Sequence, residues 1–219
     1  MSQPLYRLHA APDFASTIPH LALVHLGVPF DLVTVDFAGG GLDSPAYRAV
    51  NPLGLIPAME TPDGPVFETA AILMYLDERH PGTLGPLPGT AARAAYLSWF
   101  TFITNTIHPL TMLLVHPERA AGEAQLAAAS REIHAQLADR LGYLDRALAA
   151  DLTMDWPGIG FYMAVLFRWA RLYAAVPGDV IDPAVCPAIR ALVARVQATP
   201  AALAVAEAEA LGPHPFTVP

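Results

Sequence analysis

The sequence predicts a small α/β domain followed by an all-α domain. Over residues 1–80, segments of strand and helix character alternate in the order β-α-β and then β-β-α. The stretch at 80–90 is rich in proline and glycine, "HPGTLGPLPGT", and every later segment has the pattern of a helix. We therefore expect one domain at 1–80, a linker at 81–90 and a second domain at 91–219.

In the first domain, the strands and helices are predicted by their periodicity. Alternating or β-branched runs predict strands, and a turn at "PDG" predicts that the last two strands form a hairpin. Apolar residues on one face predict two helices, and Gly27 ends the first. The loop "AGGGLDSP" separates the two halves. In order, we expect a strand at 6–10, a helix at 17–27, strands at 30–37, 57–60 and 65–67, and a helix at 69–79.

In the second domain, helical periodicity continues to the end of the chain. The segment "GIGFYMAVLFRWARLYAA" is apolar nearly all round, which predicts the buried centre of a bundle. Pro109 removes a helical hydrogen bond and predicts a bend in the first helix. We expect helices at 91–116, 121–149, 158–175, 184–197 and 200–210.

Composition limits the kinds of partner. The chain has 219 residues, is 54% hydrophobic and carries a formal charge of −8, and all 12 of its basic residues are arginine. An acidic chain without a basic stripe argues against nucleic acid and anionic membrane surfaces as partners. The apolar run Ile159–Phe167 is too short to span a bilayer, and the N-terminus lacks a signal-peptide pattern. We expect a cytoplasmic globular protein with a large core.

Cysteine and histidine give no sign of a metal site. The single cysteine, Cys186, has no partner for an internal disulfide, which fits a reducing compartment. His20 and His25 are five residues apart and do not share a helical face, and no Cys or carboxylate stands at ligand spacing. We expect no bound metal.

The stretch "NPLGLIPAMETPDGPVFETAAILMYL" at 51–76 carries the strongest functional signal. Pro57 stands where a strand begins, and an X–Pro bond is easily held cis in a tight turn. A cis Ile56–Pro57 bond would turn the backbone of Ile56 outward, so that an extended peptide could pair with it. Thr69 would cap the next helix, leaving free N–H groups for a carboxylate, and Glu68 could bind an ammonium. These features together fit the γ-glutamyl end of glutathione.

At these residues the sequence resembles the cytosolic glutathione S-transferases, and most closely their bacterial, beta-like members. The resemblance follows the whole chain in order: "NPLGLIPAMETPDG…FETAAILMYLDERHP", "IPHLALVHLGVPFDLVTVDF", "FITNTIHPLTMLLVHPE" and "FYMAVLFRWA". It implies a thioredoxin-like first domain and a helical second domain. It also implies that Ile56 pairs with the cysteinyl part of glutathione, that Pro57 is the cis proline, and that Glu68 and Thr69 hold the γ-glutamyl end. Each of these residues also has a plain structural reading, as a turn former, a solvated first-turn acid or a helix cap.

The group that activates the thiol is harder to assign. The resemblance places Ala15 where beta-like members have a cysteine, and Ser16 follows at once. The Ser16 hydroxyl could donate to a glutathione thiolate, aided by the helix dipole, or it could simply cap the helix. Thr17 is the alternative. His108 is the second catalytic candidate, because beta-like members place a histidine here facing the glutathione sulfur. Its structural alternative is a histidine on the helix surface.

Three departures from the family pattern affect these expectations. The loop "AGGGLDS" lacks the lysine that beta-like members direct toward the glycyl carboxylate. Pro157 and Gly160 stand where the family has a Ser/Thr-x-x-Asp capping box. No cysteine lies near the site, which argues against thiol exchange through a cysteine.

The function expected is attack by glutathione, as co-substrate, on a hydrophobic small molecule held in an apolar pocket. Met112, Phe14 and Trp169 are candidate wall residues, although such residues are more often plain core. One alternative is a non-catalytic binding or scaffolding protein that kept the fold and lost the activating group. Another is a glutathione-dependent isomerase that returns glutathione unchanged. The family also implies a homodimer.

Overall fold

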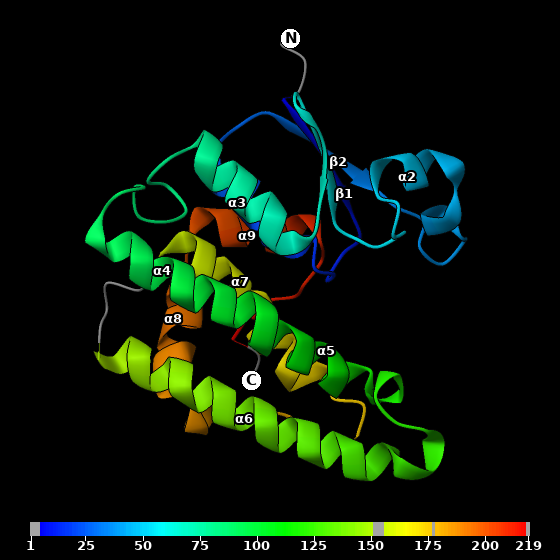
Figure 1. Cartoon of the computed structure of the whole chain (residues 1–219), viewed down its shortest axis with the longest axis vertical. Coiled ribbons are helices and arrows are strands. Elements are labelled where there is room, and N and C mark those ends of the chain that lie inside the picture. The colour runs from blue at the N-terminus through cyan, green and yellow to red at the C-terminus, as the bar shows by residue number, and fades with distance from the viewer. Residues whose placement is uncertain (1–4, 151–155, 177, 218–219) are drawn as a thin grey trace. The chain divides into compact units, whose positions relative to one another are not determined.

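A computed structural model describes residues 5–150, 156–176 and 178–217 (Figure 1). The chain divides into two compact units. The first contains Met1–Leu84 and Thr199–Pro213, and the second contains Gly85–Ala198 and His214–Pro219. The division into domains at 1–80 and 91–219, with a linker at 81–90, stays a prediction. The predicted division places residues 199–213 in the second domain, whereas the compact units place them in the first.

The first unit is built on a mixed four-stranded sheet in the order β2-β1-β3-β4. β1 pairs in parallel with β2, whereas β1 with β3 and β3 with β4 are antiparallel. This sheet with its helices confirms the predicted thioredoxin-like fold. The strands are β1 (Tyr6–Ala10), β2 (Phe30–Thr34), β3 (Ala58–Thr61) and β4 (Gly64–Phe67), and the helices in this part of the chain are α1 (Thr17–Leu26), α2 (Pro45–Val50) and α3 (Thr69–Arg79).

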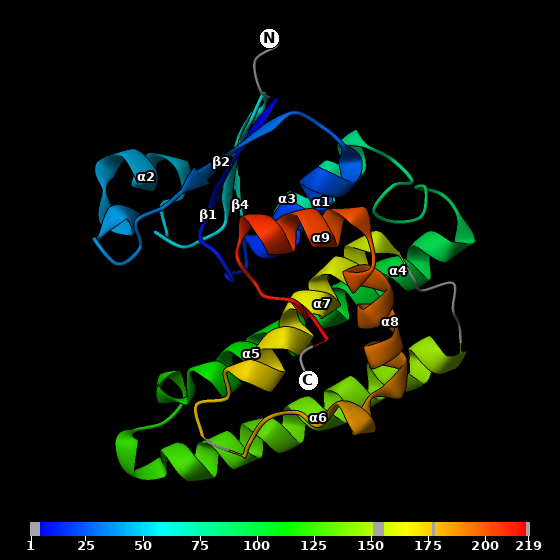
Figure 2. The same cartoon turned by 180° about the vertical axis from the view of Figure 1, so that it is seen from behind.

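The sheet is covered on both sides. Figures 1 and 2 show it nearly edge on, with α2 on one side and α1 and α3 on the other. Leu8, Ala58 and Met59 on the two central strands are completely buried, as burial of apolar side chains between layers requires. The C-terminal helix α9 (Pro200–Ala208) packs against α1 (Figure 2), so the first unit contains both early and late parts of the chain.

Helix α2 was not expected, because its segment lies beside the glycines of the loop "AGGGLDSP". The structure instead has a 3-10 turn at Gly41–Asp43 and then α2. Local signals for this helix exist: the Ser44 hydroxyl caps it by accepting from the N–H of Tyr47, and Pro45 occupies its first turn. The preceding strand is also shorter than the predicted 30–37, since β2 ends at Thr34.

The second unit is all-helical, as predicted. Its helices are α4 (Ala91–Phe102), α5 (His108–Val115), α6 (Leu126–Ala150), α7 (Pro157–Leu172) and α8 (Pro187–Gln197). Every residue of α7 from Gly158 to Ala170 is buried, which confirms this helix as the centre of the bundle. α7 packs against α4, α5 and α8, and α6 packs against α5 and α8.

The predicted single helix at 91–116 is interrupted. A π-helical turn, Ile103–Ile107, separates α4 from α5, and Pro109 lies in the first turn of α5. Proline has no N–H to give to the preceding turn, so the regular hydrogen-bond pattern cannot pass through it. Single π turns of this kind occur often at functional sites, which draws attention to His108 beside it.

Helix α7 starts without a side-chain cap. Trp156 occupies the N-cap position and makes no capping hydrogen bond, while Pro157 fills the first helical position. Gly160, in the first turn of α7, is explained by packing and not by capping. A Cβ atom at Gly160 would lie 2.9 Å from Cγ2 of Val196 on α8, closer than two carbon atoms tolerate. Glycine therefore permits the close packing of α7 on α8.

The described residues contain neither a single membrane-spanning helix nor a cluster of metal ligands. No single helix there is long and apolar enough to cross a membrane, although α8 and α9 pass that test as a pair by length and composition alone. No group of three or more His, Cys, Asp or Glu side chains within those ranges is arranged to hold a metal ion.

Candidate functional site

The β3–β4 hairpin brings the two ends of the opening motif together. Ala58 pairs with Phe67 at the end of the hairpin away from its turn. The residues just beyond this pair, Pro57 and Glu68, therefore lie opposite each other at that end. The Ile56–Pro57 peptide bond is cis, as predicted. Pro57 itself is buried and Glu68 is exposed. The site is therefore built at the edge of the sheet in the first unit, where α3 begins.

Ile56 offers its main chain for pairing. Within the described residues, neither its N–H nor its carbonyl has a hydrogen-bond partner, although the strand that follows pairs with β1 on one side and β4 on the other. Its half-buried side chain packs against the cluster of Val35, Tyr47 and Ala58. Unpaired donors and acceptors beside a sheet are what an extended peptide needs to add a strand.

Glu68 occupies the position next to Ile56 and Pro57 in an uncommon conformation. Its φ of 71° lies in the region that favours glycine, at a cost of about 1–3 kcal/mol. Such strain is concentrated at ligand clamps and active sites. Glu68 stands at the N-cap position of α3 with no capping hydrogen bond from its side chain. Its carboxylate thus remains directed to solvent beside the positive end of a helix.

Thr69 is not the helix cap that the sequence predicted. It is the first residue of α3, is buried, and follows Glu68 at the N-cap position. The predicted helix bounds, 69–79, agree with the structure. The first N–H groups of α3 have no partner within the helix, and they make its N-terminus suitable for a carboxylate.

Ser16 lies at the start of α1, but its hydroxyl is engaged. The side chain is completely buried, donates to the carbonyl of Ala11 at 3.0 Å and accepts from the N–H of Ala11 at 3.2 Å. It makes no hydrogen bond to the helix, so the capping alternative is wrong. A hydroxyl has one hydrogen, and Ala11 holds it. In this geometry, the hydroxyl links the start of α1 to the end of β1.

Glu209 is a residue of this region that the sequence did not predict. This buried carboxylate follows α9, and its Oε2 atom accepts from the Thr17 hydroxyl at 2.6 Å and from the N–H of Asp13 at 3.0 Å. Its Oε1 atom lies 2.7 Å from Nδ1 of His20. The Thr17 hydroxyl, the alternative activating group, is thus also engaged. Thr17 and Glu209 are 192 positions apart, and no local sequence pattern predicts a contact over that distance.

His108 belongs to the second unit. Its Nδ1 atom lies 2.9 Å from the hydroxyl of Tyr162, and its ring contacts those of Tyr162 and Trp169. Burial among these side chains lowers its pKa to about 4, so the imidazole is neutral at pH 7. A neutral imidazole bound at one nitrogen keeps the other available to a ligand.

The three candidate wall residues have different surroundings. Trp169 is buried beside His108, and Met112 is half-buried on α5. Phe14, in the first unit, packs its ring against Phe37 with centroids 5.0 Å apart.

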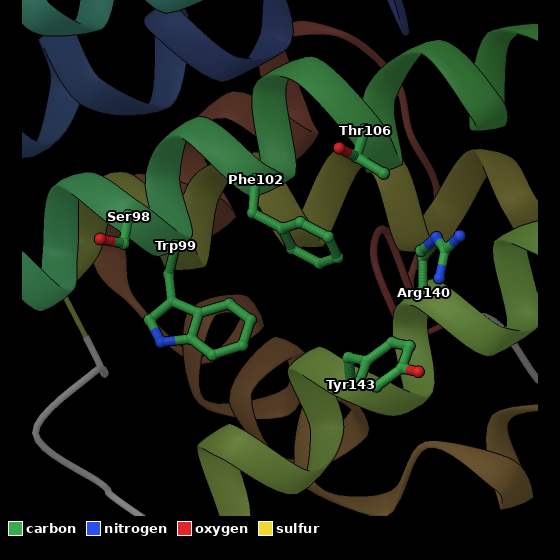
Figure 3. Close-up of a pocket in the computed structure, with 6 residues that line it drawn as sticks. All are labelled: Ser98, Trp99, Phe102, Thr106, Arg140 and Tyr143. Atoms are coloured by element: carbon green, nitrogen blue, oxygen red, sulfur yellow. The ribbon is translucent and has the colours of Figure 1, made fainter.

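A hollow of about 550 Å³ lies elsewhere in the second unit, between α4 and α6. Figure 3 shows its aromatic side chains directed toward one another from the two helices. The residues that line it are Ser98, Trp99, Phe102, Thr106, Arg140 and Tyr143.

Comparisons with known proteins agree with this geometry. The family model "Glutathione S-transferase, N-terminal domain" matches residues 16–79. Glutathione S-transferase GstA of Escherichia coli O157:H7 is 30% identical over 171 residues, which are 75% of this chain and 82% of that protein. The chain belongs to the cytosolic glutathione S-transferase family.

Solved transferase structures match nearly the whole chain. A glutathione transferase from Methylococcus capsulatus superposes with a TM-score of 0.79 at 30% identity, over 94% of this chain and 100% of that one. A sphingomonad glutathione S-transferase complexed with glutathione gives 0.74 at 28% identity, again over 94% and 100%. The match with several curated transferases is shorter. The chain spans about half the length of those relatives.

Proposed function

We propose that this family member binds glutathione and transfers its thiolate to a hydrophobic electrophile. The observation that carries the proposal is the open end of the hairpin. There, the unpaired backbone of Ile56, the exposed carboxylate of Glu68 and the N-terminus of α3 meet. Ile56 would pair with the cysteinyl backbone, Glu68 would bind the γ-glutamyl ammonium, and the first N–H groups from Thr69 onward would bind its carboxylate. The solved relative with bound glutathione supports this ligand.

The thiolate would be stabilised at the start of α1. Within the described residues, the N–H groups of Ala15 and Ser16 have no hydrogen-bond partner. Main-chain donors at a helix N-terminus stabilise an anion and lower the pKa of a thiol. We therefore assign the catalytic role of Ser16 to its main-chain N–H, while its hydroxyl holds Ala11. This role does not need the cysteine that Ala15 replaces.

His108 is the second catalytic residue that we propose. Its neutral imidazole would face the sulfur or the electrophile as a hydrogen-bond donor or acceptor and would not supply a positive charge, because burial keeps its pKa near 4. The Tyr162 hydroxyl fixes Nδ1, so Nε2 is the atom that would meet the ligand. The electrophile would be held by apolar side chains, and Met112 and Trp169 are the candidates from the second unit.

A non-catalytic glutathione-binding protein is the second candidate. The engaged hydroxyls of Ser16 and Thr17 favour it, since neither has a hydrogen left for a thiolate. Such a protein would bind glutathione through Ile56, Glu68 and Thr69 without ionising the thiol. The two candidate functions therefore share the binding site and differ only in whether the thiol of glutathione loses its proton on binding.

We also propose that the protein is a cytoplasmic homodimer. The hollow in Figure 3, with the half-buried Trp99 and Phe102 and the exposed Tyr143, supports association, because apolar surface that solvent reaches often marks an interaction site. Light scattering tests the dimer: a monomer mass at working concentration would contradict it.

The experiment that tests the function is a calorimetric titration with reduced glutathione from pH 5 to 9, in buffers of different ionisation enthalpy. Binding with proton release near neutral pH supports the transferase, and conjugation to a chromogenic aryl halide should then accompany it. Binding without release at any pH below the free thiol's pKa of about 8.5 supports the non-catalytic protein. The absence of binding would contradict both.

A further inference from the structure

We propose that Tyr47 and Asn51 are positioning residues for the glutathione site, because they fix the peptide that presents the N–H of Ile56. The Tyr47 hydroxyl donates to the carbonyl of Leu55 at 2.7 Å, and the Asn51 Nδ2 group donates to the same carbonyl at 2.6 Å. Both side chains are buried, with 5% and 2% exposure. The inference rests on the proposed binding of glutathione by Ile56.

The effect on Ile56 follows from peptide geometry. The Leu55–Ile56 bond is trans, so the carbonyl of Leu55 and the N–H of Ile56 lie in one plane and point in opposite directions. Two donors that hold the carbonyl toward the protein interior therefore direct the N–H away from them. This N–H is the group without an internal partner, and it would donate to the cysteinyl carbonyl of glutathione.

The two donors are themselves held in one orientation. Asn51 accepts from the N–H of Leu53 through Oδ1 at 3.0 Å while it donates through Nδ2, so its amide has one satisfactory orientation. Burial raises the pKa of Tyr47 to about 12, so its hydroxyl keeps the hydrogen that it donates. Arg48 adds a third contact by donating to the carbonyl of Pro52 at 2.7 Å.

These contacts give α2 a function in the site. The loop between Asn51 and Pro57 contains two exposed leucines and has little core of its own. The loop is fixed by side chains from α2 and by Asn51, the residue that directly follows α2. A loop that is fixed before the ligand arrives loses less conformational entropy on binding.

The test compares two ligands, one of which lacks the methylamide group that carries the cysteinyl carbonyl. The methylamide of γ-glutamylcysteine contains this carbonyl, whereas γ-glutamylcysteamine lacks it but keeps the γ-glutamyl group, the amide N–H and the thiol. One hydrogen bond should make the methylamide bind about fivefold more tightly to the unmodified protein. In Tyr47→Phe and Asn51→Ala, we expect this ratio to fall toward one.

Tyr75→Phe is the matched control, since the Tyr75 hydroxyl also makes a 2.6 Å hydrogen bond, to Asp63, away from the loop. It should keep the fivefold ratio. An equal loss for both ligands in Tyr47→Phe or Asn51→Ala, or an unchanged ratio, would overturn the proposal, because a general loss of stability affects both ligands alike.

A measurement on the free protein separates this inference from the proposed function. NMR relaxation of the Ile56 amide should show new slow exchange in Tyr47→Phe and Asn51→Ala and none in Tyr75→Phe. If the unmodified protein binds neither ligand, the proposed function fails, and with it the role of the two residues in a glutathione site. If it binds both and the Ile56 amide is unaffected by the variants, the positioning role alone fails.

Discussion

Nδ1 of His20 lies 2.7 Å from Oε1 of Glu209, although 188 residues separate them in the chain. The other oxygen of the same carboxylate accepts from Thr17 and from the N–H of Asp13. Glu209 therefore ties the helix that begins the proposed thiolate site to the C-terminal helix. Both groups of the pair are almost completely buried, so the loss of one leaves the other without compensation.

Replacing Glu209 should cost much of the stability of the first unit. We expect Glu209→Ala to lower the free energy of unfolding by about 3 kcal/mol or more, because three donors lose their acceptor. Glu209→Gln should cost less, since one amide oxygen remains. Denaturant unfolding measures the loss. Glu207→Ala, at an exposed position nearby, is the control, and equal effects of the two alanine variants would contradict the prediction.

The hydroxyl of Ser16 should prove structural. Ser16→Ala leaves the buried N–H of Ala11 unpaired and removes one of the two donors to its carbonyl, at a cost of about 1–3 kcal/mol in unfolding free energy. The proton released when glutathione binds should remain, because the main-chain N–H is unchanged. Ser98→Ala, which removes an exposed hydroxyl, should change neither quantity. A stable Ser16→Ala variant that no longer releases the proton would show that the hydroxyl acts on the thiol.

Glu68 should contribute to affinity through its charge. In Glu68→Gln, the backbone and the strain persist but the charge is lost, so we expect glutathione to bind about tenfold more weakly. Calorimetry gives the dissociation constant. Glu78→Gln removes an exposed charge from the same helix and serves as the control. Equal affinity of the two variants would exclude Glu68 from the site.

The burial of His108 should make stability depend on pH. Its pKa is about 4 in the folded protein and about 6.5 in an unfolded chain. Between these values the unfolded state binds more protons, so stability rises with pH. The contribution is complete above pH 6.5 and is lost as the pH falls toward 4, by about 3 kcal/mol at most.

Unfolding of His108→Gln at several pH values tests this dependence. The variant should lose less stability than the unmodified protein between pH 6.5 and 4, whereas His25→Gln, at an exposed position, should keep the original slope. An NMR titration of the His108 ring with a midpoint near 6.5 would contradict the prediction directly.

Gly160 should resist the substitution that usually strengthens a helix. Alanine is favoured over glycine by about 1 kcal/mol in a helix interior, but its Cβ would lie 2.9 Å from Cγ2 of Val196. We expect Gly160→Ala to destabilise the protein by about 1–2 kcal/mol as a result of overpacking. In a Val196→Ala background the same change should become neutral or stabilising. A stabilising effect in the unmodified background would show that α8 adjusts freely.

Local patterns in the sequence were sufficient for most of the fold. β1 and α3 have the predicted bounds, the hairpin forms where "PDG" predicts a turn, and the apolar segment around Phe161 is the buried helix. These features depend on neighbours in the chain. Helix α2 was missed because the glycines beside it outweighed the cap formed by Ser44 and Pro45. The long helix at 91–116 was predicted without the π turn, because Pro109 indicates an interruption but not its form.

The candidate site was predictable where it depends on the hairpin and not where it depends on distant contacts. The cis bond before Pro57 and the place of Glu68 at the start of α3 follow from one short stretch. Glu209 and Tyr162 could not be found in this way, because each contacts its partner across a distance in the chain that no periodicity records. The two donors to Leu55 are close to it in the chain, but their contacts depend on the conformation of an irregular loop. The engagement of Ser16 with Ala11 depends in the same way on the conformation of the loop between β1 and α1.

The placement of α9 in the first unit affects how the protein is made. The carboxylate that holds Thr17 and His20 belongs to a residue that is synthesised long after α1 and after the whole helical unit between them. Until then, the part of α1 that α9 covers in the finished protein has no partner from this helix. A fragment that ends in the linker would have the sheet and the hairpin without this covering helix. The proposed glutathione site is thus encoded before the helical unit, whereas the helix that completes its own unit is encoded after it.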